Sequence, residues 1–106
     1  MSTSRIVIGT TPTIMYSFSI VKPTDFVSAV LTIKKRAGEV VLRKELTEGF
    51  IVGNSLCWKL SQEDTLGLET RTYLMRANWL TADGTRGVTP ETHLQCERNH
   101  INEVMT

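Results

Sequence analysis

The chain has 106 residues, enough for one domain that buries roughly 60 to 70% of its unfolded surface without a metal or a disulfide. Its 12 Lys and Arg against 11 Asp and Glu give a formal charge of +1, which argues against a nucleic-acid partner. No stretch approaches the roughly 20 apolar residues of a membrane helix, and the N-terminus lacks the basic and apolar pattern of a secretory signal. We therefore expect no membrane partner and synthesis in a cytoplasm.

The first half of the chain is typical of strands separated by turn residues. A short apolar run ends at Gly9, and a second run, in which apolar and polar residues alternate, follows Pro12. Two further alternating runs, 29–34 and 40–46, flank the turn residues 36–38. Because a glycine-containing connection of three residues favours a tight reversal, these runs predict an antiparallel hairpin.

The segment 56–66 predicts a strand followed by a capped helical turn. Leu56, Trp58 and Leu60 alternate with polar or smaller residues, so they share one face of a pleated strand. Ser61 then offers its hydroxyl to the free amides of a new helical turn, and Asp64 stands three residues later, where its carboxylate completes a capping box. We expect Ser61 and Asp64 to cap a helix over Gln62–Leu66.

The second half of the chain predicts one more hairpin. A long alternation over 72–79 puts one row of large side chains on a single face, and Asp83-Gly84 supplies a residue that tolerates positive φ for a tight turn. The returning segment Val88–Cys96 contains Pro90, which cannot donate to a sheet ladder. We expect this last strand to lie at an edge and to be kinked or bulged.

About seven short strands separated by turn signals predict an all-β fold, an antiparallel β-sandwich in a single domain over 1–106, with a C-terminal tail at 99–106. A small closed barrel is the alternative fold. The residues expected to form the core share alternating positions with other large side chains. They are Tyr16, Phe18, Leu31, Ile33, Leu56, Trp58, Leu60, Leu66, Tyr73, Met75 and Trp79.

Four residues are the candidate metal ligands: Cys57, His93, Cys96 and His100. A structural zinc site requires paired ligands presented from tight turns, and the spacing of these four does not provide such pairs. We therefore expect no metal and no cofactor. A Cys57–Cys96 disulfide is also disfavoured, because Cys57 points away from the core if its two strand neighbours point inward.

The sequence offers few residues for catalysis. No Gly-x-Ser-x-Gly element is present, and Gly9-Thr10-Thr11-Pro12 lacks the second glycine and the lysine of a phosphate loop. Glu63 and Asp64 are better explained by the first turn of a capped helix than by acid–base catalysis. The basic run 34–36 falls at a predicted hairpin tip, where charged residues are common. These observations predict a protein that is not an enzyme and has no small-molecule substrate.

Four segments in order carry a resemblance to a known family: GTTPTIMYSF, AVLTIKKRAGEVVLRKEL, NSLCWKLSQEDTLGLE and RTYLMRANWLTADGT. The chain resembles small immunoglobulin-like sandwich proteins of tailed bacteriophages and of prophages of Gram-positive bacteria. It looks most like the N-terminal domain of phage baseplate upper proteins, on the Gly-x-Thr-x-Thr-like opening at 9–13 and the corner at 60–66. The similarity spans roughly Arg5 to Val104 and describes a strand and turn order.

The resemblance implies an immunoglobulin-like fold and a non-enzymatic virion protein, made in the bacterial host cytoplasm. Such a protein is a baseplate, tail or capsid-associated assembly module that contacts other virion subunits or copies of itself. Proteins of this family continue into a stalk whereas this chain stops at Thr106, so a capsid-decoration, head–tail or tail-accessory role is also expected. The alternative function is a carbohydrate-binding module that recognises a host cell-surface glycan through an exposed aromatic platform.

Apolar residues near both ends of the chain are the candidate protein-contact residues: Ile6, Ile8, Ile101, Val104 and Met105. The last three lie beyond the last predicted strand, and their spacing places them on one face of a helical turn. Short apolar segments of this kind commonly fill a groove on a neighbouring subunit. The alternative is that this tail folds back over its own sandwich and covers an open edge.

Overall fold

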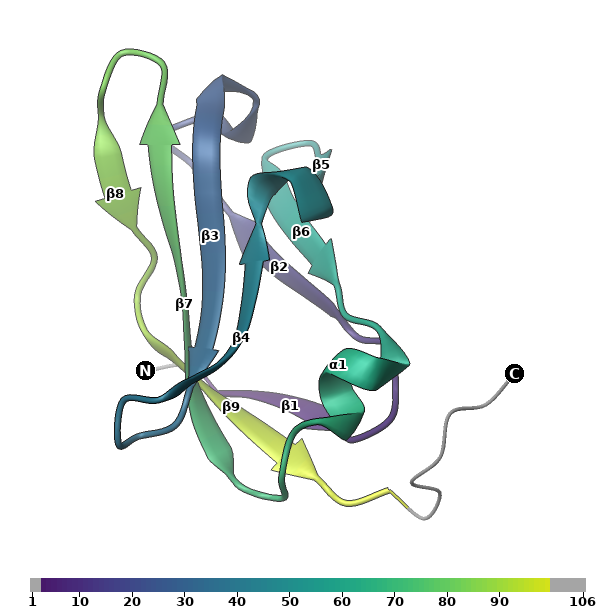
Figure 1. Ribbon diagram of the computed structural model, residues 1–106. Helices are drawn as coiled ribbons and strands as arrows, with labels where there is room; N and C mark the ends of the chain where they lie inside the picture. The colour runs from purple at the N-terminus through teal and green to yellow at the C-terminus, as the bar shows by residue number, and fades with distance from the viewer. Residues whose placement is uncertain (1–2, 100–106) are drawn as a thin grey trace.

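A computed structural model describes residues 3–99, which form two β-sheets packed face to face (Figure 1). The larger sheet has the strand order β1-β9-β7-β3-β4, and β8 also pairs with β7. Its strands are β1 (Thr3–Val7), β3 (Phe26–Lys34), β4 (Val40–Glu45), β7 (Thr72–Thr81), β8 (Arg86–Val88) and β9 (Thr92–Glu97). The smaller sheet has the order β2-β6-β5, with β2 (Thr13–Ser17), β5 (Phe50–Val52) and β6 (Ser55–Lys59).

The strand order is that of an immunoglobulin-like sandwich. In that fold the second, fifth and fourth strands form one sheet, and the third, sixth and seventh form the other, with an extra strand beside the third in variable-type domains. Here β2, β6 and β5 form the first sheet, and β3, β7 and β9 form the second with β4 as the extra strand. The predicted fold class is therefore confirmed, and the closed barrel is wrong because the described strands of the two sheets do not pair with each other.

Three details of the predicted fold need correction. The described residues contain nine strands rather than about seven, and two 3₁₀ turns, η1 (Pro23–Asp25) and η2 (Leu46–Glu48), accompany α1 (Gln62–Leu66). The sandwich is not wholly antiparallel, because β1 runs parallel to β9. Pro90 does split the last strand into β8 and β9, but β9 lies between β7 and β1, so only the β8 part is an edge.

Local hydrogen bonds fix the connection between the two sheets after β6. The Oγ of Ser61 accepts from the N–H of Asp64 at 3.0 Å, and the Asp64 carboxylate accepts from the N–H of Ser61 at 2.9 Å, which confirms the predicted capping box. The hydroxyl of Tyr73, at the start of β7, accepts from the N–H of Glu69 at 2.8 Å. This bond is the tyrosine corner that immunoglobulin-like sandwiches form where the chain enters this strand.

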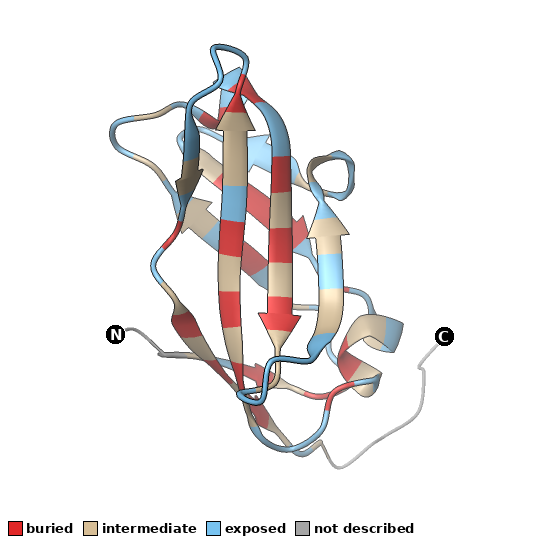
Figure 2. Ribbon diagram, turned by 60° about the vertical axis from the view of Figure 1, so that its left-hand side comes forward, coloured by how far each residue is buried: buried red, intermediate tan, exposed pale blue. Residues whose placement is uncertain are grey.

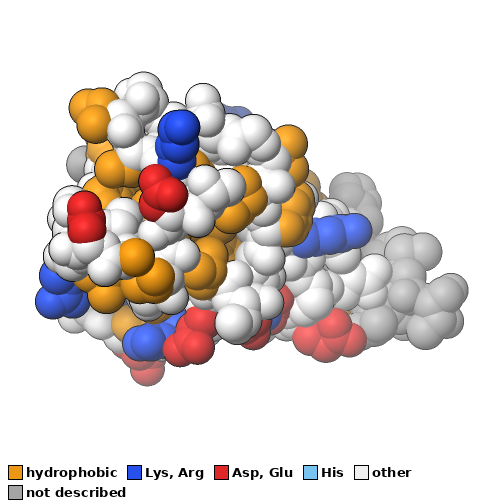
Figure 3. Space-filling view, turned by 90° about the horizontal axis from the view of Figure 1, so that it is seen from above, with side chains coloured by type: hydrophobic (Ala, Val, Ile, Leu, Met, Phe, Trp, Pro, Cys, Tyr) orange, Lys and Arg blue, Asp and Glu red, His pale blue; other side chains and the backbone are white. Residues whose placement is uncertain are grey.

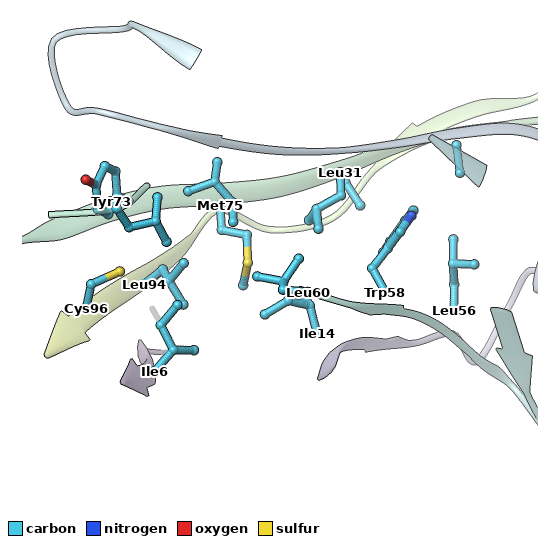
Figure 4. Close-up of a cluster of buried hydrophobic side chains, with 14 of the residues drawn as sticks. Ile6, Ile14, Leu31, Leu56, Trp58, Leu60, Tyr73, Met75, Leu94 and Cys96 are labelled. Carbon is cyan, nitrogen blue, oxygen red and sulfur yellow. The ribbon is translucent and has the colours of Figure 1, made fainter. Parts of the chain in front are cut away.

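The core lies between the sheets, where buried positions alternate with partly exposed ones along β3 and β7 (Figure 2). Side chains from both sheets point toward one another there (Figure 4). The predicted core residues that are buried are Leu31, Ile33, Leu56, Trp58, Leu60, Tyr73 and Met75. Four others, Tyr16, Phe18, Leu66 and Trp79, are only partly buried and pack against the margin of the core.

The prediction that Trp79 belongs to the core is therefore only partly correct, because its side chain is partly buried. It lies near the end of β7, where the sandwich narrows to a hairpin, and its ring stacks on Phe26 with centroids 5.2 Å apart. Phe18 meets both rings edge-on, which closes a three-membered aromatic cluster. Phe26 belongs to the buried core, and Phe18 and Trp79 pack against it as partly buried residues.

Candidate interaction surface

The predicted contact residues near the N-terminus do not form a surface. Ile6 and Ile8 are only 6% and 8% exposed and belong to the chain's own core, so their assignment as protein-contact residues is wrong. The reason is the parallel pairing of β1 with β9, which places Ile6 beside the buried Cys96, while the N–H of Ile8 donates to the carbonyl of Glu97 at 3.0 Å. The other three, Ile101, Val104 and Met105, lie outside the described residues.

The candidate metal ligands are spread over different faces of the sandwich. Cys96 is buried in the core, and burial raises the pKa of its thiol to about 11. His93 is three residues away on the same strand and therefore on the opposite face, while Cys57 belongs to the other sheet. His100 lies outside the described part of the chain, and residues 3–99 contain no group of three or more potential ligands.

The smaller sheet carries an apolar surface that the sequence reasoning missed. Met15 and Phe50 are the cross-strand partners of Cys57, and Val52 lies two pairs further along β5, opposite Ser55. Partners in an antiparallel ladder share a face, and Leu56 and Trp58 face the core, so these side chains point outward. Met15, Phe50 and Val52 are 56%, 46% and 56% exposed. We call these three residues the small-sheet patch.

Cys57 lies in the middle of this patch. The prediction that it points away from the core is confirmed by its register, yet the residue is completely buried. Its cross-strand neighbours Met15 and Phe50 lie on either side of it on the same face. Ile51, between Phe50 and Val52, is also exposed, so three successive apolar residues are exposed along the edge strand β5.

A second apolar feature lies at the end of the sandwich where β7 turns into β8. A groove of about 660 Å³ separates residues 20–27 from the hairpin 81–85. Ile20 on its rim is 95% exposed and Val27 is 57% exposed. Seen from this end, apolar side chains gather between scattered charged ones (Figure 3). We call this feature the loop-end groove.

The hairpin beside the loop-end groove is held rigidly. The carboxylate of Asp83 accepts from the Thr81 hydroxyl and from the N–H of Thr85 at 3.0 Å. The hydrogen bond from Thr81, followed by that from Thr85, lowers the pKa of Asp83 to about 2. The aromatic cluster of Phe18, Phe26 and Trp79 lies at the same end. Hydrogen bonds and aromatic contacts therefore hold the chain in place at this end, beside the groove.

Within residues 3–99, the pKa of a second carboxylate, that of Asp64, is also lowered by local contacts. Burial acts to raise the pKa of Asp64, but the hydrogen bond from the Ser61 N–H and the Lys44 ammonium at 3.0 Å outweigh it and lower the pKa. Asp64 thus holds the start of α1 and joins it to β4. Both perturbed carboxylates stabilise turns, and neither lies in a cluster of titratable groups.

Comparisons with known proteins bear on the fold. No family model matches the sequence, and no curated protein matches it. Among solved structures, CopC from Methylosinus trichosporium OB3b is similar with a TM-score of 0.59 and 12% identity, covering 95% of this chain and 89% of that one. The V domain of amphioxus IgVJ-C2 is similar with a TM-score of 0.34 and 17% identity, covering 88% of this chain and 97% of that one. At such low identity the likeness to CopC shows the fold alone.

Among residues 3–99, no helix has the length and apolar character that crossing a membrane requires.

Proposed function

We propose that this chain is a non-enzymatic structural protein of a tailed-bacteriophage virion. It is an assembly module of the baseplate, the tail or the capsid, and it acts through protein–protein contacts. The observation that carries the proposal is the small-sheet patch, together with the three successive exposed apolar residues of β5. The virion setting comes from the resemblance of the strand and turn sequences described above.

Exposed apolar residues in isolation are ordinary, but a contiguous group on one sheet face indicates a contact surface. The small-sheet patch joins two strands across the buried Cys57, so its apolar atoms form one surface rather than separate points. Sheet faces of this kind pack against the sheet of another protein with side chains interdigitated. The loop-end groove provides a second contact area with an apolar rim, which suits a subunit with more than one neighbour.

Glycan recognition receives less support from the arrangement of the aromatic residues. A sugar-binding platform needs exposed rings that are free to stack on a ligand. Of the seven aromatic residues, all within the described range, only Phe50 is exposed. Phe18, Phe26 and Trp79 contact one another, and Trp58 is completely buried.

The proposal is tested by placing a charge on the patch. Val52→Lys in the phage that encodes this chain should lower its incorporation into purified particles by about tenfold, equivalent to about 1.4 kcal/mol of contact free energy. Val40→Lys is the matched control, because Val40 is 52% exposed on β4 of the other sheet. Quantitative mass spectrometry of the particles gives the readout.

Two outcomes would contradict the proposal. If the wild-type chain were absent from purified particles, the proposed virion role would be wrong. Equal incorporation of Val52→Lys and the wild type would show that the small-sheet patch is not the contact surface.

A further inference from the structure

Strand β2 has one unpaired edge in the described structure. An immunoglobulin-like sandwich normally pairs its first strand with its second, but here β1 pairs with β9 in the other sheet. On its other side β2 pairs with β6. The position beside β2 that a first strand would take is therefore not filled by residues 3–99.

The hydrogen-bond pattern shows which backbone groups face this open edge. The N–H of Leu60 donates to the carbonyl of Pro12, and the N–H of Phe18 donates to the carbonyl of Asn54, both at 2.9 Å. In an antiparallel ladder only alternate residues bond to a given neighbour, so the even-numbered residues of β2 bond to β6. The N–H and C=O groups of Thr13, Met15 and Ser17 therefore point away from β6.

Strand β2 itself carries neither of two features that usually protect edge strands, a charged residue or a proline. Proteins discourage edge-to-edge pairing with charged side chains, prolines or bulges. The edge strands of the larger sheet all carry charge: β1 has Arg5, β8 has Arg86, and β4 has Arg43, Lys44 and Glu45. Strand β2 has the sequence TIMYS, with no charged residue and no proline. Strand β5 is also uncharged, but its pairing leaves only Ile51 with free backbone groups at the edge.

Space for a further strand exists along this edge. A groove of about 570 Å³ lies beside β2. Its lining includes Thr13, Met15 and Ser17 of β2 and Ser4, Arg5 and Ile6 of β1. Its lining combines the free backbone groups of β2 with apolar side chains such as Ile14 and Met75. This combination matches what an added β-strand requires, since the main chain forms hydrogen bonds and alternate side chains enter the groove.

We propose that the occupant is a second copy of this chain, whose β2 pairs antiparallel with β2 about a twofold axis at Met15. The inference deepens the proposed function, on which it rests, by naming a partner. The three residues with free backbone groups are spaced symmetrically about Met15, so this register forms about six hydrogen bonds, more than the neighbouring registers form. Thr13 then lies opposite Ser17 of the other copy, and neither of the two paired β2 strands carries a charged residue.

The same register is chemically self-complementary. Hydroxyl side chains meet hydroxyl side chains at Thr13 and Ser17, which is a favourable cross-strand pair. On the outer face Met15 meets its own counterpart, so the small-sheet patches of the two copies become continuous. Self-complementarity about an axis is the condition for a closed dimer interface.

The first experiment separates backbone pairing from side-chain contact. Sedimentation equilibrium of the full-length wild type should show a concentration-dependent dimer. Thr13→Pro removes one edge donor from each copy and leaves the β2–β6 bonds intact, so it should weaken dimerisation about tenfold. Thr13→Ala keeps the N–H and loses only the hydroxyl, so it should weaken dimerisation less than Thr13→Pro does. A wild type that stays monomeric at high concentration overturns the proposal, and so does a Thr13→Pro dimer as tight as the wild type's.

The second experiment tests the register by cross-linking. Met15→Cys is made together with Cys57→Ala, because Cys57 is its cross-strand neighbour within one copy. Opposed Met15 positions lie about 5.5 Å apart between Cα atoms, within reach of a disulfide, whereas the two Thr13 positions lie about 14 Å apart. Oxidation should link Met15→Cys dimers and leave Thr13→Cys, in the same background, unlinked. The reverse result overturns this register even if the protein is dimeric.

The two proposals fail in different ways. Val52 lies at the far edge of the smaller sheet, so Val52→Lys should leave the dimer unchanged while it lowers particle incorporation. Normal incorporation of a monomeric wild type would overturn the dimer and leave the virion function standing. A dimer that is absent from particles would overturn the function and leave the pairing standing.

Discussion

Gly87 on β8 is the position where one added methyl group should be most damaging. A Cβ at Gly87 would lie 2.0, 2.4 and 2.6 Å from Cζ2, Cε2 and Cη2 of Trp79, far inside ordinary van der Waals contact. The φ of Gly87 is not among the positive values, so the backbone itself accepts alanine. Any cost of Gly87→Ala must therefore come from moving the indole.

The indole cannot move freely because it is stacked on Phe26 and meets Phe18 edge-on. Overpacking of this kind costs about 1 to 3 kcal/mol, and an aromatic contact contributes about 0.5 to 1.5 kcal/mol. We expect Gly87→Ala to lower the free energy of unfolding by about 2 to 3 kcal/mol. Urea denaturation followed by circular dichroism measures this change.

A double-mutant cycle isolates the cause. In a Trp79→Val background the ring is absent, so Gly87→Ala should then cost less than about 0.5 kcal/mol. Gly67→Ala is a control, because Gly67 has φ −74° and an added Cβ there would meet its nearest atom at 3.6 Å. The reasoning is refuted if Gly87→Ala costs the same with and without Trp79, or if it costs nothing in the wild type.

Three further predictions concern residues described above. Trp58→Ala should lower the free energy of unfolding by about 3 to 5 kcal/mol, because it empties a fully buried site and removes the hydrogen bond from Nε1 to the Glu45 carbonyl. A decrease below about 1 kcal/mol in chemical denaturation would contradict the core assignment. Ser61→Ala should cost about 1 kcal/mol whereas Ser61→Asp is nearly neutral, and equal losses in thermal melts would speak against capping. Asp83 has a folded pKa of about 2 against an ordinary value of 3.8, so its carboxylate stabilises the fold above about pH 4 and this contribution disappears toward about pH 2. Melting temperatures of the wild type and Asp83→Asn should therefore converge over that range, and a constant gap would show that the hairpin does not depend on this charge.

Local patterns were sufficient to predict the parts of the fold that depend on neighbours in sequence. The alternation around Trp58 and the capping box of Ser61 and Asp64 both depend on residues within a few positions, and the structure confirms both. The parallel pairing of β1 with β9 could not be predicted in this way, because it joins residues from opposite ends of the chain. Without that pairing, Ile6 and Ile8 resemble free apolar residues near a terminus, which is why they were expected to contact a partner.

The small-sheet patch was missed for a related reason. Alternation identifies which residues of one strand share a face, but the exposure of a face depends on what other segments cover it. Only the register of β2, β6 and β5 brings Met15 and Phe50 to either side of Cys57. The signal available in the sequence was the run of three apolar residues at 50–52, which a two-residue period does not explain.

The parallel pairing of β1 with β9 also constrains the order in which parts of the protein can fold during synthesis. Of the described strands, β1 leaves the ribosome first and its partner β9 leaves last, about ninety residues later. Contacts between such distant segments close late and slow the folding of a domain. Until then Ile6, Ile8 and the inner face of β9 remain without their final cover, and exposed apolar strands in incomplete chains promote aggregation. Stalling translation before β9 should therefore yield a nascent chain whose first strand is still accessible to proteases and chaperones.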